Sequence, residues 1–279
     1  MELRYEQRFA VALTIRGCPH KEHTHSVTRI FTTPPELGAL LAALESIDPK
    51  RLTACPGWTA HHLAAHIAGN YEEVHGHIEA FAAGHPLERT RNWEEREQPL
   101  RDLDHATLLA RIDDLAAATT TAVHDLLAEK PDAELIWTKR TVPISGLLTH
   151  MRSEDALHRW DLVGDDETSL DLLSQQNLLT HAVTFIGSPL LQRGRQAGSG
   201  KATFVARVRS PGGDDLVVES IDGDARLSVG PPEGEATIEG DPAARLLLLW
   251  GRKPSPFFRL QTLGDGESAL RVQNLLSGY

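Results

Sequence analysis

One predicted helix carries ionisable side chains where an ordinary bundle helix carries apolar ones. Residues 145–164 show helical spacing, and Leu147 and Met151 mark the stripe that faces the protein interior. Glu154 and His158 continue that stripe within about 20° of the same line. A carboxylate buried without a partner is strongly unfavourable, and the group neutralises instead. The rest of the fold must therefore bring a compensating group to this helix.

A second predicted helix offers part of that compensation. Thr59 can cap a helix that runs to about residue 83, and an apolar stripe follows it with helical spacing. His66 lies roughly 60° from that stripe and borders the buried face. His75 and His77 lie off the stripe, and we expect both to be solvated.

The three inward side chains suggest a metal centre. A glutamate and a histidine four residues apart on a helix point the same way, and both are ligands of divalent ions. We therefore predict a divalent metal held by His66, Glu154 and His158, with Asp161 accepting the second ring N–H of His158. The alternatives are a metal-free ion pair between Glu154 and His158, or Arg152 reaching back to Glu154.

Two further helices and a change of period complete the fold prediction. One helix expected from about residue 33 keeps helical spacing through Leu37, Leu40, Leu41 and Leu44, and another is expected over about 104–129. Together with the first two they give a four-helix bundle in which residues 84–103 form a long polar loop. After an acidic linker, a helix is expected over 171–186, and beyond Gly200 the hydrophobic pattern changes to period two. The final segments each follow a strand, Gly-Asp turn, helix order. We predict an α+β protein of two domains, with an extension, a bundle and a sheet domain over residues 1–31, 32–165 and 166–279.

Composition excludes several classes of partner. The formal net charge is −11, from 28 Lys+Arg against 39 Asp+Glu, which argues against nucleic acid. No stretch approaches the roughly 18 apolar residues that span a membrane, and the start lacks a signal-peptide core, so we expect a cytoplasmic location. Two cysteines, Cys18 and Cys55, imply no disulfide framework. The predicted extension also contains a cluster of possible metal ligands, Cys18, His20, His23 and His25. We interpret this cluster as part of a terminal segment rather than as a metal site.

Two motifs resemble a known family. CPGWTAHHLAAHIAG (55–69) resembles the first signature of the mycothiol-dependent maleylpyruvate isomerase family, which belongs to the DinB-like superfamily. SEDALHRWDL (153–162) resembles its second signature, a glutamate and a histidine four apart followed by Trp-Asp. EGDPAARLLLLWGR (239–252) is similar to the family's small C-terminal α+β domain, which is sterol-carrier-like in shape. Residues 1–31 are not part of the family pattern.

The resemblance implies a function and specific roles. Its metal ligands correspond to His66, Glu154 and His158, its metal is typically zinc, and its cosubstrate is the thiol mycothiol. Arg252 is the best match to an arginine that holds an anionic substrate. The implied chemistry is cis–trans isomerisation or S-transfer on a small electrophile, in a monomer or homodimer, and Cys55 is expected to pack rather than act as the nucleophile. The alternatives are a non-catalytic regulatory or ligand-binding protein stabilised by metal, and a metal hydrolase that needs no thiol.

Overall fold

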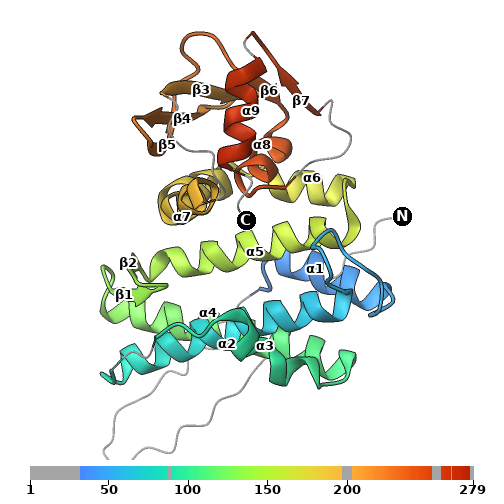
Figure 1. The fold of residues 1–279 in the computed structure, drawn as a ribbon. Coiled ribbons are helices and arrows are strands. Elements are labelled where there is room, and N and C mark those ends of the chain that lie inside the picture. Colours follow the sequence, from blue (N-terminus) through green and yellow to red (C-terminus); the bar gives the residue numbers. More distant parts are fainter. Residues whose placement is uncertain (1–31, 87–88, 197–202, 253–258, 265, 277–279) are drawn as a thin grey trace, which may run out of the picture.

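The computed structural model describes the chain over residues 32–86, 89–196, 203–252, 259–264 and 266–276. The predicted extension, with its cysteine and three histidines, lies outside these ranges. Within them, helices dominate the first part of the chain and a sheet forms in the last part (Figure 1). The predicted α+β class is confirmed.

The four-helix bundle consists of α1 (Pro35–Ser46), α2 (Ala60–Ala82), α4 (His105–Glu129) and α5 (Ser145–Val163). α2 packs against α4 and α5, while α1 packs against α5. The ends of these helices lie within a few residues of the predicted ones. The fully buried stripe of α2 includes Leu63, Ile67, Val74 and Ile78.

The start of α2 is set by its first residues. The Thr59 side chain accepts a hydrogen bond from the His62 backbone N–H at 3.3 Å, and the His62 ring faces the Thr59 N–H in return. These contacts satisfy N–H groups that have no partner inside the helix. Fixing the first turn also fixes which face of α2 carries His66, one turn further on.

Removing this cap should measurably weaken the bundle. Thr59→Ala should lower the free energy of unfolding by about 1 kcal/mol, because a first-turn N–H of α2 loses its acceptor. Urea unfolding measures the change. Thr121→Ala is the matched control, since the exposed Thr121 hydroxyl only bonds the Ala117 carbonyl within α4. Equal losses in the two variants would contradict the capping role.

Three elements depart from the sequence prediction. The expected loop 84–103 contains α3 (Trp93–Arg101), and the expected acidic linker contains α6 (Glu167–Leu173). A hairpin of β1 (Glu134–Trp137) and β2 (Arg140–Pro143), which the sequence did not predict, precedes α5. Both helices are short and turn only two side chains each into the core, so a helical period is hard to detect. Their caps are the stronger signal: Asn92 accepts from Glu95 N and Asp166 from Ser169 N.

The C-terminal half is a mixed five-stranded sheet covered by helices. Its strands are β3 (Phe204–Arg209), β4 (Asp215–Ile221), β5 (Asp224–Gly230), β6 (Ile238–Gly240) and β7 (Leu260–Thr262). Their order is β5-β4-β3-β6-β7, with β3 and β6 parallel and the other pairs antiparallel. α7 (Gln176–Gln196) replaces the shorter helix expected over 171–186. α8 (Pro242–Leu249) and α9 (Gly266–Leu275) complete the two predicted strand, turn, helix units.

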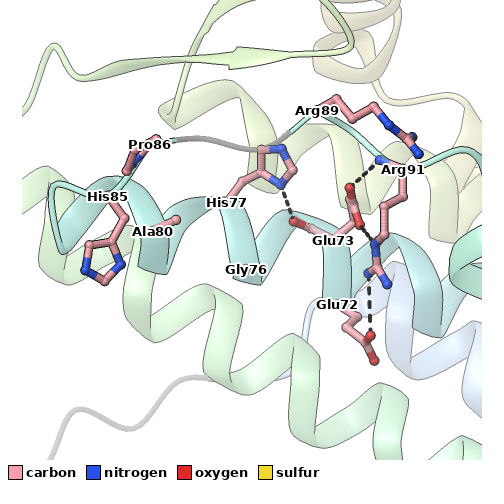
Figure 2. Close-up of a pocket in the computed structure, with 9 residues that line it drawn as sticks. All are labelled: Glu72, Glu73, Gly76, His77, Ala80, His85, Pro86, Arg89 and Arg91. Carbon is pink, nitrogen blue, oxygen red and sulfur yellow. Dashed lines mark hydrogen bonds and ion pairs between the residues drawn. The ribbon is translucent and has the colours of Figure 1, made fainter.

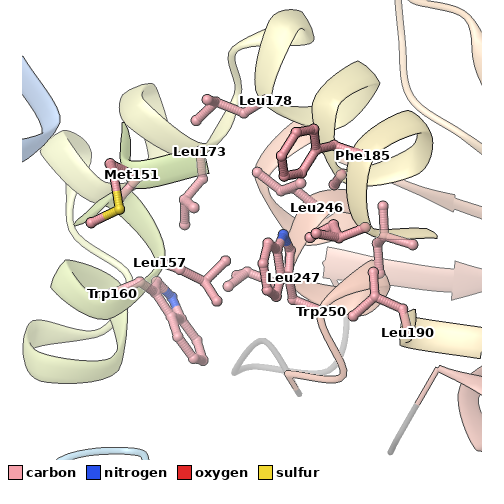
Figure 3. Packing of buried hydrophobic residues seen from close by; sticks show 14 of the residues in the cluster. Met151, Leu157, Trp160, Leu173, Leu178, Phe185, Leu190, Leu246, Leu247 and Trp250 are labelled. Carbon is pink, nitrogen blue, oxygen red and sulfur yellow. The ribbon is translucent and has the colours of Figure 1, made fainter. Parts of the chain in front are cut away.

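One hydrophobic core joins the two halves. Leu157 and Trp160 of α5 face Leu247 of the helix Pro242–Leu249 and Trp250, which caps that helix (Figure 3). α6 contacts α5 and α8, while α7 contacts α5 and β5, so both helices lie between the bundle and the C-terminal half. The helix that carries Glu154 and His158 is therefore also the surface on which the second half packs. A domain boundary near residue 165 remains our proposal.

None of the described helices is long and apolar enough to cross a membrane.

Candidate metal centre

Three predicted side chains meet between α2 and α5. His66 Nε2 lies 3.7 Å from Glu154 Oε2, and His158 Nε2 lies 3.4 Å from the same oxygen. One ligand atom from each residue lies within 4.8 Å of the other two. Glu154 and His158 are 3% and 4% exposed, whereas the His66 side chain is 13% exposed. The group is therefore buried on the α5 side and accessible from the α2 side.

The turn before α2 packs an aromatic ring on the two histidines. Gly57 has φ +79°, a conformation that favours glycine, and it lets the chain reverse before Trp58. The Trp58 ring lies 5.0 Å from the His66 ring and 6.3 Å from the His158 ring, between centroids. Trp58 therefore acts as a wall of the site, consistent with a packing role.

Each histidine turns its other ring nitrogen to a carboxylate. His66 Nδ1 lies 2.6 Å from Glu97 Oε1, and His158 Nδ1 lies 3.0 Å from Asp161 Oδ2. These contacts favour a proton on Nδ1 of both rings, so Nε2 is the nitrogen of each ring that a metal beside Glu154 would bind. His66 Nε2 also lies 3.0 Å from Asn70 Nδ2. A metal-binding histidine usually has this arrangement, with the distal N–H on a carboxylate. The two-nitrogen, one-oxygen donor set therefore fits a divalent ion such as zinc.

The two supporting carboxylates are themselves anchored. Glu97 of α3 accepts from Arg101 at 2.8 Å. Asp161 accepts from Arg252 at 2.8 and 3.2 Å, and from the Cys55 thiol at 3.2 Å. Arg252, which was expected to hold a substrate anion, thus bonds Asp161 with two of its nitrogens. The structure connects it to the site through Asp161 and His158.

Electrostatics in the site favour a deprotonated glutamate. Burial acts to raise the pKa of Glu154, but hydrogen bonds from His158 and His66 hold that pKa well below its usual value. Burial also acts to lower the pKa of His158, but its neighbours Asp161, Cys55 and Glu154 raise that pKa well above the ordinary value. A metal must displace this proton to bind His158 Nε2, so metal affinity should fall at acid pH.

One metal-free alternative from the sequence does not fit the geometry. Arg152 points away from Glu154 and forms a two-fold contact with Glu36 of α1, at 2.7 and 3.0 Å, and a further bond to Gln175. Glu36 is fully buried, so this pair serves the packing of α1 on α5.

Two more histidines extend the site along α5 and α7. His150, one turn before Glu154, places Nε2 3.8 Å from Glu154 Oε1. Its ring lies 5.7 Å from the ring of His181 and stacks on Phe185 at 5.6 Å. Burial lowers the pKa of His181 to about 3 and also lowers that of His150. The sequence analysis missed both, although His150 has the same four-residue spacing as Glu154 and His158.

His77 corrects another expectation. It was predicted to be solvated, but it is 7% exposed, with Nδ1 2.9 Å from the Glu73 carbonyl and its ring 5.2 Å from that of Trp137. The reason is the unpredicted β1 strand, which covers this side of α2. His77 lines a cavity of about 380 Å³ that none of the three candidate ligands lines (Figure 2). The Glu73 carboxylate in that cavity already accepts two hydrogen bonds from Arg91. The Arg91 backbone N lies 2.6 Å from Glu73 Oε1, and Arg91 Nε lies 2.6 Å from Glu73 Oε2.

The buried His181 should make the protein acid-sensitive. Its folded-state pKa of about 3 lies below the unfolded value near 6.5, so the unfolded chain binds the proton first and stability falls as pH drops below about 6.5. His181→Phe keeps an aromatic ring in the stack and removes the imidazole whose protonation lowers the stability. Between pH 7 and pH 5 the wild type should lose about 2 kcal/mol more unfolding free energy than the variant, measured with a chelator present. Parallel pH profiles would contradict the assignment.

The fold and site together define a class: an α+β protein whose four-helix bundle carries a candidate metal centre beside a sheet domain. Residues 35–163 match the family model described as "Mycothiol maleylpyruvate isomerase N-terminal domain". This match confirms the resemblance seen in the two sequence signatures.

Solved structures agree on the fold. A crystal structure of the mycothiol-dependent maleylpyruvate isomerase is similar to this chain with a TM-score of 0.53 and 18% identity, over 81% of this chain and 88% of that one. A histidine-to-alanine mutant of that enzyme gives a TM-score of 0.55 and 17% identity over the same shares. At this identity the likeness shows the fold alone. No curated protein matches the sequence significantly.

Proposed function

We propose that this protein is a metal-dependent enzyme that uses a low-molecular-weight thiol, mycothiol, as the nucleophile on a small electrophile. The observation that carries the proposal is the arrangement of the two histidines. Both Nε2 atoms face one oxygen of Glu154, while both Nδ1 atoms face a carboxylate. The family-model match supports the thiol, because mycothiol is in the name of the matching domain.

His66, Glu154 and His158 would hold the ion, which we propose to be zinc. Three protein ligands leave coordination positions open, and a divalent cation there would stabilise the thiolate form of a bound thiol. The chain's own residues orient the ligands and limit access to the site. Glu97 and Asp161 hold the two imidazoles in the ligating tautomer, and the buried α5 side limits access to the partly exposed face at His66.

Two outcomes are compatible with this site. In isomerisation, the sulfur adds to one carbon of an activated double bond, the resulting single bond rotates, and the sulfur leaves again with the thiol unchanged. In S-transfer, the sulfur displaces a leaving group or opens an epoxide, and the thiol is consumed. In both, the protein supplies activation and orientation and the thiol supplies the nucleophile.

A thiol assay distinguishes the proposal from its alternatives. Zinc-loaded protein should isomerise maleylpyruvate when mycothiol is present, or consume mycothiol with a bimane electrophile, and should do neither when the thiol is omitted. Turnover without thiol would indicate a metal hydrolase. Metal binding without turnover under any of these conditions would indicate a non-catalytic regulatory or ligand-binding protein.

A further inference from the structure

Two histidines outside the candidate metal centre contact each other where four helices begin or end. His61 is the second residue of α2, and His105 is the first residue of α4. His61 Nδ1 lies 3.2 Å from His105 Nδ1, and both side chains are partly exposed. We call these two residues the histidine pair.

The other nitrogen of each ring is held by a backbone carbonyl. His61 Nε2 lies 3.0 Å from the carbonyl oxygen of Arg101, the last residue of α3. His105 Nε2 lies 3.3 Å from the carbonyl oxygen of Leu44, in the last turn of α1. Carbonyls in the last turn of a helix have no partner inside that helix. The histidine pair therefore joins the ends of α1 and α3 to the starts of α2 and α4.

These contacts fix where the ring protons lie. A carbonyl oxygen only accepts hydrogen bonds, so both Nε2 atoms must carry a proton. A neutral imidazole has one such proton, which leaves both Nδ1 atoms as bare acceptors that face each other. Two acceptors in contact are unfavourable, and within the described chain neither ring bonds any other side chain. The pair therefore lacks one donor.

The geometry between the rings identifies the missing group as a proton. The ring centroids are 5.5 Å apart, which is the nitrogen separation plus one ring radius on each side, so the two nitrogens lie close to the line between the ring centres. A single proton on that line gives an N–H···N hydrogen bond. A zinc ion on the same line would need a gap of about 4 Å, twice the Zn–N distance. The observed separation is too short for such an ion.

The positive charge of this proton is not attracted by a neighbouring carboxylate. The starts of α2 and α4 disfavour a cation, whereas the carbonyl ends of α1 and α3 favour one, so these fields oppose each other. Further ionisable side chains adjoin these contacts along the chain, and none of them bonds either ring: Glu45, His62, Arg101, Asp102 and Asp104. The hydrogen bond that the pair would otherwise lack is what retains the proton.

We propose that His61 and His105 share one proton between their Nδ1 atoms, and that this singly charged pair fixes α3 on the bundle. The connection continues from α3 to the candidate metal centre. Arg101, whose carbonyl bonds His61, donates from its side chain to Glu97, and Glu97 bonds His66. The histidine pair is thus a positioning element for the helix that orients His66. This inference goes beyond the proposed function, because the shared proton requires neither metal nor thiol.

Nuclear magnetic resonance of the full chain, labelled with ¹⁵N-histidine, tests the shared proton directly. At pH 7 one proton should lie on each Nε2 and a third between the Nδ1 atoms. The third proton should produce a scalar coupling between the two Nδ1 nuclei, assigned by its absence in His105→Gln. The matched control is His85→Gln, which removes an exposed histidine and should leave the coupling unchanged.

The pH dependence of stability gives a second readout. Histidines in the unfolded chain release their protons above about pH 6.5, so a proton that the folded pair keeps stabilises the fold less as the pH rises. Between pH 7 and pH 9 the thermal midpoint of the wild type should therefore fall by roughly 2–4 °C more than that of His105→Gln. The raised pKa of His158 affects both proteins equally and cancels in this comparison.

The positioning role has its own signal in the same spectra. The Nδ1–H resonance of His66 should shift in His105→Gln, because α3 and its Glu97 are held less firmly, and should stay in place in His85→Gln. An unchanged His66 resonance in His105→Gln would contradict the positioning role.

The outcomes separate this inference from the proposed function. A wild type without the coupling, or with a pH profile parallel to that of His105→Gln, would overturn the shared proton even if thiol turnover is observed. The coupling together with the steeper pH profile would support it even if no thiol reaction is found. His61→Gln covers the case in which His105→Gln does not fold, and it should show the same losses.

Discussion

Replacing His66 by alanine should abolish thiol-dependent turnover while leaving the protein folded. His66 supplies one of three candidate ligand atoms, and its Nε2 lies 3.7 Å from Glu154 Oε2. Loss of a residue that merely supports a ligand typically costs 10–100-fold in metal affinity or activity, so loss of a ligand should exceed about a hundredfold. His66 lies at the border of the buried apolar stripe of α2 and is not part of it, so its replacement by alanine leaves that stripe intact.

His75→Ala provides the matched control for that experiment. His75 lies on the same helix and pairs only with the exposed Glu79, at 3.4 Å. The two variants should show the same helical content by circular dichroism, and only His66→Ala should lose turnover. Retention of full turnover by His66→Ala, or equal losses in both variants, would refute the assignment.

Arg252→Ala should weaken both the fold and the metal centre. Asp161 is buried and accepts two bonds from Arg252, so removing the arginine leaves a buried carboxylate without its guanidinium partner. Breaking such a pair costs about 3–5 kcal/mol of unfolding free energy. Asp161 in turn orients His158, so metal affinity should also fall about 10–100-fold. Chemical denaturation and competition with a zinc chelator measure the two effects.

This experiment separates two roles for Arg252. A direct role in substrate binding would raise KM for an acidic electrophile and leave the metal affinity unchanged. A positioning role lowers metal affinity as well, whatever the charge of the electrophile. Arg226→Ala, which removes an exposed arginine on β5, should change neither quantity. Unchanged zinc affinity in Arg252→Ala would contradict the positioning role.

The long helices of the bundle were predictable because their periodicity is sustained. α2 and α5 each bury residues over several turns, so the apolar spacing fixes both their extent and their inward face. The same argument placed Glu154 and His158 inside, since they occupy the buried stripe of α5. The strand, turn, helix units at the end of the chain were predicted for a similar reason.

The short elements were not predicted, and the part of the site that they carry was therefore missed. α3 turns only Glu97 and Leu100 into the core and contains Pro99, so it resembles a polar loop. Yet α3 supplies Glu97, which holds His66. The β1–β2 hairpin, with four residues in each strand, places Trp137 against His77 and explains why His77 is buried.

Long-range contacts were the other part that the sequence could not predict. Arg252 was identified by a motif, but its partner, Asp161, lies 91 positions away and depends on how the sheet half packs on α5. Likewise, nothing in the local pattern of α7 indicates that His181 lies beside His150. Helical spacing predicts which side chains share a face, while the partner across the interface depends on tertiary packing.

The zinc content of the purified protein tests the central claim most directly. Elemental analysis of the wild type, in parallel with His158→Ala, measures how many metal ions each chain retains. We predict about one divalent ion per wild-type chain, as expected for a single three-residue site, and close to none in the variant. A wild-type protein that holds no metal after incubation with zinc, or a His158→Ala protein that holds as much as the wild type, would contradict the account.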